Sequence, residues 1–252
     1  MCVIIIKQQK KQIELDILIR SAEKNPHGLG IVWLDNYTIS FHKSEDYKLL
    51  MTDRPFIAHF RLATMGGVSL ENRHPFKCGK TDEWLMQNGT IYGLGNKNTC
   101  DTKVLASQLA KVPRTHWKNE LSKHNCRFVS INTEAKTFER YNKSDWHRHE
   151  GIWYSKDNVL LKHHIAVYGT LKYGNSNYHR FLSQAKYIDS AQTCNRYPLL
   201  IEGLPYMVEE EGLGYHVDVD VFAVSDSQLA RIDSLEGHPQ WYRRKEIEVQ
   251  TI

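Results

Sequence analysis

Cysteine is the second residue of this chain, in the opening segment MCVIII. Methionine aminopeptidase removes Met1 when the next residue is small, and Cys2 would then carry both a thiol and a free α-amino group. The usual pKa of such an amine is about 8, so the amine can act as the general base for its own nucleophile. The alternative is a small hydrophobic residue at the start of a buried strand. Position alone leaves both interpretations open, and the rest of the chain must supply a substrate site.

Short motifs further along the chain carry polar residues in a fixed order. They are HFRLAT with Arg61 and Thr64, NRHPF with His74, QNG with Asn88 and Gly89, and CDT with Asp101. Taken singly each motif is weak, because an arginine at a strand end is usually a surface residue and Asn-Gly is usually a turn. Together with a cysteine at position 2, and in this order, they are specific.

In this combination the motifs resemble those of the class II glutamine amidotransferases, the family of glutaminases with an N-terminal nucleophile. The resemblance covers about residues 1–160 and implies a four-layer αββα sandwich. It implies that Cys2 is the catalytic nucleophile. The thiolate would attack the γ-amide of glutamine, form a γ-glutamyl thioester and release ammonia, after which water frees glutamate.

The same resemblance implies roles for the residues around the nucleophile. Arg61 would hold the α-carboxylate of glutamine with its fixed pair of N–H donors, and Asp101 would bind the α-ammonium group. Asn88 and the backbone N–H of Gly89 would form the catalytic oxyanion hole. Thr64 and residues 28–30 would shape the substrate pocket.

Two positions depart from the pattern of the resembled family. Gln87 stands where the family has a histidine, and Cys100 stands where it has a serine. Neither change removes a catalytic atom. Gln87 can still position the Asn88 loop by hydrogen bonding.

A second set of motifs begins with VYGTLKYGNSN at residues 167–177 and continues with YPLLIEG and ARIDSLEGHPQWYRRKEIEV. A strand that runs into a glycine turn exposes backbone N–H groups, which suit a carboxylate. An ordinary strand, turn and helix is the alternative for this stretch. Glu236 follows an apolar helix and precedes a Gly/Pro turn, so we expect it at the rim of that turn.

These motifs resemble the γ-glutamylcyclotransferase family, in its small branch with γ-glutamylamine cyclotransferase and the plant avirulence-induced proteins. The resemblance covers about residues 163–252 and implies a small mixed β-barrel. Glu236 would be the general acid and base that relays a proton from the α-amine to the leaving amine. The γ-glutamyl group would be bound by Tyr168, Gly169, Thr170, Leu171 and Tyr242.

The reaction implied for this unit is attack of the α-amine of the substrate on its own γ-carbonyl carbon. It releases 5-oxoproline and a free amine, and neither resemblance implies a cofactor or a metal ion. Family members usually continue past the EV of residues 248–249 into another hairpin and strand. We therefore expect either a trimmed ending in this branch or a C-terminally shortened chain.

Hydrophobic periodicity predicts the elements that position these residues. Strands are expected at residues 3–6, 30–33, 38–42, 56–60, 90–92, 127–131, 137–141, 151–154, 165–168, 217–224 and 245–251, and helices at 12–24, 101–111, 177–185 and 226–235. Asp101 is the expected N-cap of its helix. The predicted fold class is therefore α+β, with an amidotransferase-like domain at residues 1–160 and a cyclotransferase-like domain at residues 161–252.

Composition limits the partners that we expect. The 252 residues include 33 Lys and Arg and 29 Asp and Glu, with a formal net charge of +4 and without a long run of like charge. No nucleic-acid partner is implied. Five scattered cysteines argue against a disulfide framework, and the apolar stretch after Cys2 is too short for a signal peptide or a membrane span. We expect a cytoplasmic protein without a membrane partner, and a composition rich in Lys, Asn and Tyr suggests a phage or bacterial genome.

Three functional hypotheses follow. The first is a bifunctional enzyme that acts on glutamine or a γ-glutamyl amine, with a separate ligase or synthetase chain as a partner that accepts ammonia. The second is a ligand-binding or regulatory module in which one or both sites are inactive. The third is a metal enzyme that uses His147, His149 and Glu150 with residues 163–164.

Overall fold

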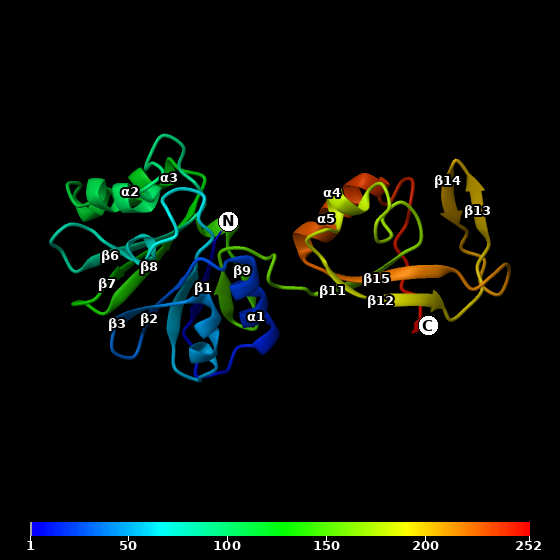
Figure 1. The fold of residues 1–252 in the computed structure, drawn as a ribbon, viewed down its shortest axis with the longest axis horizontal. Helices are drawn as coiled ribbons and strands as arrows, with labels where there is room; N and C mark the ends of the chain where they lie inside the picture. Colours follow the sequence, from blue (N-terminus) through cyan, green and yellow to red (C-terminus); the bar gives the residue numbers. More distant parts are fainter. Residues whose placement is uncertain (1) are drawn as a thin grey trace. The chain divides into compact units, whose positions relative to one another are not determined.

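The computed structural model describes residues 2–252, so the processing of Met1 lies outside the described residues. The chain forms two compact units, Met1–Lys156 and Asp157–Ile252 (Figure 1). The division falls between residues 156 and 157, slightly before the expected boundary at residues 160 and 161. Both units combine helices with antiparallel sheets, as an α+β chain should.

The first unit contains two antiparallel sheets. The six-stranded sheet has the order β3-β2-β4-β1-β10-β9, with β1 (Val3–Lys7), β2 (Leu29–Trp33), β3 (Thr38–His42), β4 (Phe56–Phe60), β9 (His147–His149) and β10 (Ile152–Tyr154). The four-stranded sheet has the order β5-β6-β7-β8, with β5 (Phe76–Lys77), β6 (Glu83–Asn88), β7 (Arg127–Asn132) and β8 (Thr137–Tyr141).

The two sheets of the first unit pack face to face through a shared apolar core. Ile4 and Ile6 of β1 lie in one cluster with Met86 of β6 and Val129 of β7. Because side chains alternate along a strand, Val3 and Ile5 point to the opposite face of the sheet. All four residues of the VIII run are nevertheless buried. A strand that is covered on both faces reads as a continuous apolar run, which explains the opening sequence of the chain.

Helices cover the outer faces of both sheets. Leu105 and Leu109 of α2 (Asp101–Leu109) and Leu121 of α3 (Trp117–Ser122) pack with Leu85 and Phe128 of the four-stranded sheet. Helix α1 (Leu15–Lys24) buries Ile17 and Leu18 and lies beside the six-stranded sheet (Figure 1). Short 3-10 turns complete the unit, namely η1 (Ser44–Leu50), η2 (Leu70–Asn72), η3 (Arg114–His116) and η4 (Lys143–Asp145). The layers therefore run helix, sheet, sheet, helix.

The second unit is built on a four-stranded antiparallel sheet and a separate hairpin. The sheet has the order β11-β15-β12-β16, with β11 (His163–Val167), β12 (Lys186–Thr193), β15 (Asp218–Val224) and β16 (Val249–Thr251). The hairpin pairs β13 (Leu199–Glu202) with β14 (Leu204–Met207). Helices α4 (Tyr178–Phe181) and α5 (Asp226–Glu236) contribute to the apolar core around Phe222 and Ile232.

Hydrogen bonds fix the start of α5, and a glycine in the left-handed conformation ends it. Ser225 caps the start of α5, and its hydroxyl and the Gln228 side chain form a reciprocal capping box. The buried Asp157 carboxylate accepts a hydrogen bond from the backbone N–H of Ser227 at 2.8 Å. Gly237 takes the left-handed conformation, with φ 63°, that ends a helix readily. These contacts hold Glu236 at the last position of α5.

Three structural expectations are corrected. The described residues of the second unit form an antiparallel sheet with β11 and β16 at its edges, rather than the expected mixed β-barrel. The strand expected at residues 90–92 is wrong, because β6 ends at Asn88 and the chain turns at Gly89 with φ 139°. Cys100, not Asp101, is the N-cap of α2. The carboxylate of Asp101 is instead used by the neighbouring loop, as described below.

The close packing of β2 against the loop before β5 gives a stability prediction. A methyl group on Gly30 would overlap the carbonyl oxygen of His74, whereas one on Gly67 would have no neighbour nearer than 3.9 Å. We expect Gly30→Ala to lower the free energy of unfolding by about 1–3 kcal/mol because backbone must move. Gly67→Ala is the matched control and should change it by less than about 0.5 kcal/mol. Urea denaturation followed by tryptophan fluorescence checks both, and equal effects would contradict the prediction.

Candidate functional site

In the first unit, residues from several elements line one small cavity. The cavity brings together Cys2, Arg61, Thr64, Gly89 and Asp101. Cys2 directly precedes β1, Arg61 and Thr64 follow β4, Gly89 follows β6, and Asp101 begins α2. Its other lining residues are Leu62, Ala63, Met65, His74, Gln87, Cys100 and Thr102. The cavity volume is about 10 Å³, which is room for roughly one water molecule. Of the residues expected in this site, Asn88 and residues 28–30 do not line the cavity.

Cys2 lines this cavity and is 8% exposed. Its Sγ accepts a hydrogen bond from the backbone N–H of Leu62 at 3.3 Å. Burial raises the pKa of the Cys2 thiol, and the Leu62 N–H and the Arg61 charge offset only part of that effect. The thiol is therefore neutral at neutral pH and needs a base before it can act as a nucleophile.

Arg61 is a buried cation, 2% exposed, that has no acidic partner among residues 2–252. Its guanidinium donates to the carbonyl oxygens of Met65 at 3.1 Å, Gly66 at 3.1 Å and Gly67 at 3.2 Å. A buried charge without an opposite charge is costly. This side chain is therefore suited to an anionic group that enters the cavity.

Asp101 is a buried carboxylate, opposite in charge to Arg61, and hydrogen bonds hold it in place. Its Oδ2 accepts from the backbone N–H of Ile91 at 2.7 Å and from the side-chain amide of Gln87 at 3.0 Å. Its Oδ1 accepts from the backbone N–H of Thr102 at 2.9 Å. The Gln87 carbonyl in turn accepts from the Thr102 hydroxyl at 3.1 Å. Gln87, the residue that departs from the family pattern, thus orients the Asp101 carboxylate.

Two histidines in ring contact adjoin this network. The rings of His59 and His74 are 3.9 Å apart between centroids, and both side chains are buried. Burial lowers the pKa of His59 to about 3 and that of His74 well below its usual value, so both rings are neutral. Nε2 of His74 hydrogen-bonds the Thr102 hydroxyl at 2.8 Å, and Nε2 of His59 lies 3.0 Å from the backbone carbonyl oxygen of Gln87. The two histidines thus help to position Gln87 and Thr102 through hydrogen bonds.

Asn88 and Gly89 end β6 beside the cavity. A methyl group on Gly89 would overlap the Cys126 sulfur, and its φ of 139° also favours glycine. The Asn88 amide nitrogen donates to the Ser155 hydroxyl at 2.9 Å and to the Ser155 carbonyl at 3.2 Å. Its Oδ1 is buried and has no hydrogen-bond partner among residues 2–252.

Ser155 is a functional candidate that the sequence analysis missed. Its hydroxyl oxygen accepts from Asn88 and also from the backbone N–H of Ile4 at 2.7 Å. A half-turn of the Asn88 amide would let Oδ1 accept the proton of the Ser155 hydroxyl and would place the NH₂ group where Oδ1 now lies, but it would break the bond to the Ser155 carbonyl. Ser155 lies 67 residues from Asn88, and no local pattern marks it.

In the second unit, Tyr168, in the loop that follows β11, and Tyr242 both contact the β13–β14 hairpin. The Tyr168 hydroxyl accepts from the backbone N–H of Met207 at 3.3 Å, and the Tyr242 hydroxyl donates to the Pro205 carbonyl at 3.2 Å. The Tyr242 ring stacks on that of Tyr206, with centroids 5.2 Å apart and planes within 2°. Pro205 also packs against Gly169. The β13–β14 hairpin is thereby anchored next to the YGTL loop.

Glu236 lies at the end of α5, close to two of these tyrosines. Burial raises the pKa of its half-buried carboxyl. Its charge contributes to the raised pKa of both Tyr168 and Tyr242, for which burial is the largest cause. The structure therefore brings together the expected acid/base and two expected binding residues.

The remaining expected residues of this unit have different surroundings. The Thr170 hydroxyl accepts from the Asn177 side-chain amide at 3.0 Å, and the Gly169 carbonyl accepts from that of Asn175 at 3.1 Å. The Leu171 side chain is buried in the core with Phe222. Leu171 can therefore offer a ligand only its backbone groups.

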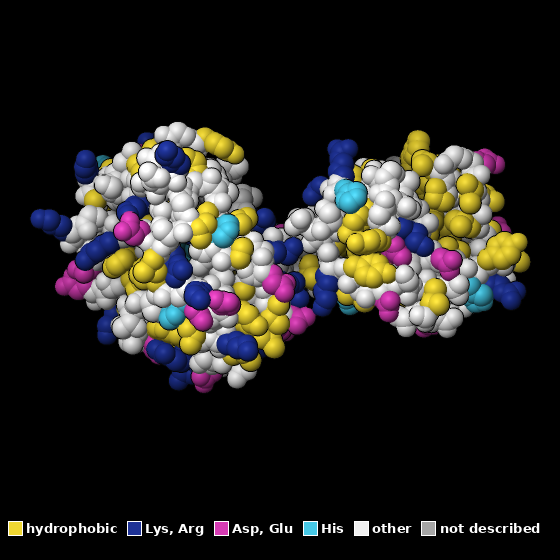
Figure 2. Space-filling view, in the orientation of Figure 1, with side chains coloured by type: hydrophobic (Ala, Val, Ile, Leu, Met, Phe, Trp, Pro, Cys, Tyr) yellow, Lys and Arg dark blue, Asp and Glu magenta, His cyan; other side chains and the backbone are white. Residues whose placement is uncertain are grey.

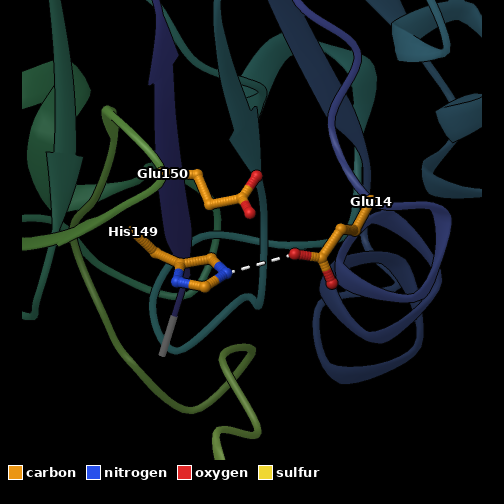
Figure 3. Close-up of side chains that lie close together, drawn as sticks. All are labelled: Glu14, His149 and Glu150. Atoms are coloured by element: carbon orange, nitrogen blue, oxygen red, sulfur yellow. Dashed lines mark hydrogen bonds and ion pairs between the residues drawn. The ribbon is translucent and has the colours of Figure 1, made fainter.

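The histidine motif expected as a metal site is divided between two places. His149 and Glu150 lie with Glu14, and one ligand atom from each lies within 4.8 Å of the others (Figure 3). His163 instead pairs with Asp226, with 2.8 Å between Nε2 and Oδ1.

The surface carries both basic and acidic side chains among apolar ones (Figure 2). No helix within residues 2–252 has the length and apolarity to cross a bilayer.

Comparison with known proteins places the second unit in a family. Residues 165–252 match the family described as Gamma-glutamyl cyclotransferase, AIG2-like. A Methanocaldococcus jannaschii protein, named by inference as a gamma-glutamylcyclotransferase, is 37% identical over 86 residues, which are 34% of this chain and 71% of that protein. Gamma-glutamylaminecyclotransferase C of Danio rerio is 35% identical over 100 residues, 37% of this chain and 66% of that protein.

A solved structure gives a similar match. The crystal structure of an AIG2-like protein from Mus musculus has 31% identity and a TM-score of 0.34, over 35% of this chain and 65% of that one. Through its second unit, the chain belongs to the gamma-glutamyl cyclotransferase, AIG2-like family. It spans about two thirds of the length of these relatives. The family match begins at residue 165, so the interpretation of the first unit depends on its own geometry.

The position of Ser155 gives a prediction for the first unit. Ser155→Ala removes the acceptor shared by the Ile4 N–H and the Asn88 amide. We expect it to lower the free energy of unfolding by about 1–3 kcal/mol, because buried donors lose their partner. Ser144→Ala, at an exposed position, is the control and should have an effect within about 0.5 kcal/mol. Chemical denaturation measures both, and an unchanged Ser155→Ala midpoint would refute the proposed role.

Proposed function

We propose that the second unit is a γ-glutamyl cyclotransferase that converts γ-glutamyl amines to 5-oxoproline and free amines. The observation that carries this proposal is the half-buried Glu236 carboxyl beside Tyr168 and Tyr242. Membership of the gamma-glutamyl cyclotransferase, AIG2-like family supports it. The names of relatives, such as that from Danio rerio, indicate γ-glutamyl amines as the substrate class.

The proposed reaction is intramolecular. The α-amine nitrogen of the substrate forms a bond to its γ-carbonyl carbon, and the bond from that carbon to the leaving amine nitrogen breaks. Glu236, as a carboxylate, takes a proton from the attacking amine and then donates it to the leaving amine. A carboxyl whose pKa is raised by burial is better matched to both steps than an exposed glutamate. The backbone N–H groups of residues 169–171 are the proposed donors to the substrate carboxylate.

Substitution of Glu236 tests this assignment in the full-length protein. Glu236→Gln should reduce 5-oxoproline release from a γ-glutamyl alkylamide by about 100-fold or more, because the proton relay is lost. Glu246→Gln, at an exposed position of the same unit, should retain activity. In the wild type, activity should fall as the pH drops through the raised pKa of Glu236, at a higher pH than the usual 4.5. Full activity of Glu236→Gln, measured by chromatography of the products, would exclude the assignment.

We propose that the first unit is a cysteine glutaminase of the class II amidotransferase type. The observation that favours this second function is the cavity that joins the Cys2 thiol, the Arg61 guanidinium and the Asp101 carboxylate. An α-amino acid carries one carboxylate and one ammonium group, which match the unpartnered charge of Arg61 and the charge of Asp101. The order of helix and sheet layers is also the one that the sequence resemblance implies.

In the proposed reaction, the Cys2 sulfur forms a bond to the γ-carbonyl carbon of glutamine, and the bond from that carbon to the amide nitrogen breaks. The free α-amine of Cys2 takes the thiol proton and passes it to the amide nitrogen, which leaves as ammonia. Water then cleaves the thioester and restores the thiol. The Gly89 N–H is the proposed first donor to the oxyanion. The Asn88 NH₂ is the proposed second donor, after the Asn88 amide has rotated by a half-turn against Ser155. A glutamine side chain is larger than the present cavity, so residues 62–66 must move outward when it binds.

A glutamine analogue that alkylates thiols tests the first unit. Treatment with 6-diazo-5-oxo-norleucine should add one adduct to the wild type, and intact mass should also show whether Met1 has been removed. The adduct should be absent from Cys2→Ala and present in Cys194→Ser, whose sulfur lies in the other unit. Tight binding of glutamine without an adduct would indicate a ligand-binding module. Retention of Met1 without an adduct would refute the glutaminase.

The two proposed sites recognise the same γ-glutamyl group. A bifunctional enzyme for γ-glutamyl compounds is therefore the overall function that we propose, and a separate ligase chain that accepts ammonia is the proposed partner of the first unit.

A further inference from the structure

Glu14, His149 and Glu150 form a cluster in the first unit that neither proposed reaction uses. His149 and Glu150 belong to the hairpin between β9 and β10, and Glu14 immediately precedes α1 (Figure 3). Nε2 of His149 lies 3.1 Å from Oε1 of Glu14, although the two residues are 135 positions apart in the sequence. One ligand atom from each of the three lies within 4.8 Å of the others.

The sheet register places a fourth polar group on the same face. Trp153 packs in the core between the two sheets. Its neighbour Tyr154 therefore points to the opposite face, where α1 lies. His147 pairs directly with Tyr154, and His149 follows His147 by two positions, so His149 shares this face.

Tyr154 is an independent observation that points to a ligand at this cluster. Its side chain is 0% exposed, and its hydroxyl has no hydrogen-bond partner among the described residues. The Glu14 and Glu150 carboxylates and the Arg20 guanidinium all lie close enough to act electrostatically on this hydroxyl. A buried hydroxyl normally has a partner. A metal-bound water between the two carboxylates would supply one.

The chemistry of the cluster fits a metal of intermediate hardness. One imidazole and two carboxylates form a mixed nitrogen and oxygen set, which suits Zn²⁺, Mn²⁺ or Co²⁺ better than Mg²⁺ or Cu⁺. Lys11 forms an ion pair with Glu150 and is the cation that a metal must displace. The Lys11 and Glu150 side chains are 51% and 46% exposed, so their exchange requires little rearrangement.

We propose that Glu14, His149 and Glu150 bind a divalent first-row transition-metal ion, with Tyr154 as the hydrogen-bond partner of a metal-bound water. The ion would fasten the segment before α1 to the β9–β10 hairpin. Because β9 is an edge strand of the six-stranded sheet, the expected role is structural.

A titration of the full-length, EDTA-treated protein with Co²⁺ tests the proposal. The visible spectrum should saturate at one equivalent, and Zn²⁺ should then displace the Co²⁺. The spectrum should lack the intense near-ultraviolet band of thiolate ligation, because the proposed site has no cysteine. Bound metal should also raise the melting temperature, since an ion that binds only the folded state stabilises it.

Matched variants locate the ion. His149→Ala and Glu14→Gln should each weaken binding by about tenfold or more, and Tyr154→Phe should weaken it less. His164→Ala, an exposed histidine of the other unit, should bind as the wild type does. Glu14→Gln keeps the size of a half-exposed side chain, so it separates loss of the ligand from loss of the fold. Equal affinity in wild type, His149→Ala and Glu14→Gln, a thiolate band, or no binding at all would each overturn the proposal.

Discussion

The burial of β1 at the centre of the six-stranded sheet is the constraint on which the rest of the first unit depends. Val3–Lys7 pairs with β4 on one side and with β10 on the other. Both of its faces are buried, so a shift by one residue would move every side chain into the core on the opposite face of the sheet, where it does not match its neighbours. This fixed register puts Cys2 at the end of β4, beside Arg61. It also lets the Ile4 N–H reach the Ser155 hydroxyl, which in turn holds Asn88.

The charged groups of the two candidate sites differ in how their surroundings stabilise them. Hydrogen bonds from backbone and side-chain donors surround the Asp101 carboxylate, whereas only carbonyl oxygens surround the Arg61 guanidinium. That asymmetry leaves a preference for an anion in the first unit. In the second unit, the surroundings of Glu236 are apolar and aromatic, and its pKa rises. Burial there favours a carboxyl that can exchange a proton.

Sequence patterns predicted the elements whose apolar residues follow a clear period. The strand at residues 56–60 is confirmed as Phe56–Phe60, and the predicted helix at residues 226–235 matches α5 closely. The strand expected at residues 90–92 failed because the true strand, β6, includes the polar residues Glu83, Gln87 and Asn88. Those side chains have partners in distant parts of the chain, such as Asp101 and Ser155, and a local pattern cannot reveal such partners.

The sequence by itself determined the chemical inventory of this protein: a cysteine at position 2, an arginine after a strand, a YGTL loop and a glutamate at a helix end. It also determined the family of the second unit, because each motif of that unit is a short continuous stretch of sequence. Only the tertiary structure decided that Cys2, Arg61 and Asp101 share one cavity, that Ser155 supports Asn88, and that Glu14 joins His149 and Glu150. Each of these contacts joins residues far apart in the chain. They depend on strand pairing and sheet packing, whose register is set by burial over the whole unit.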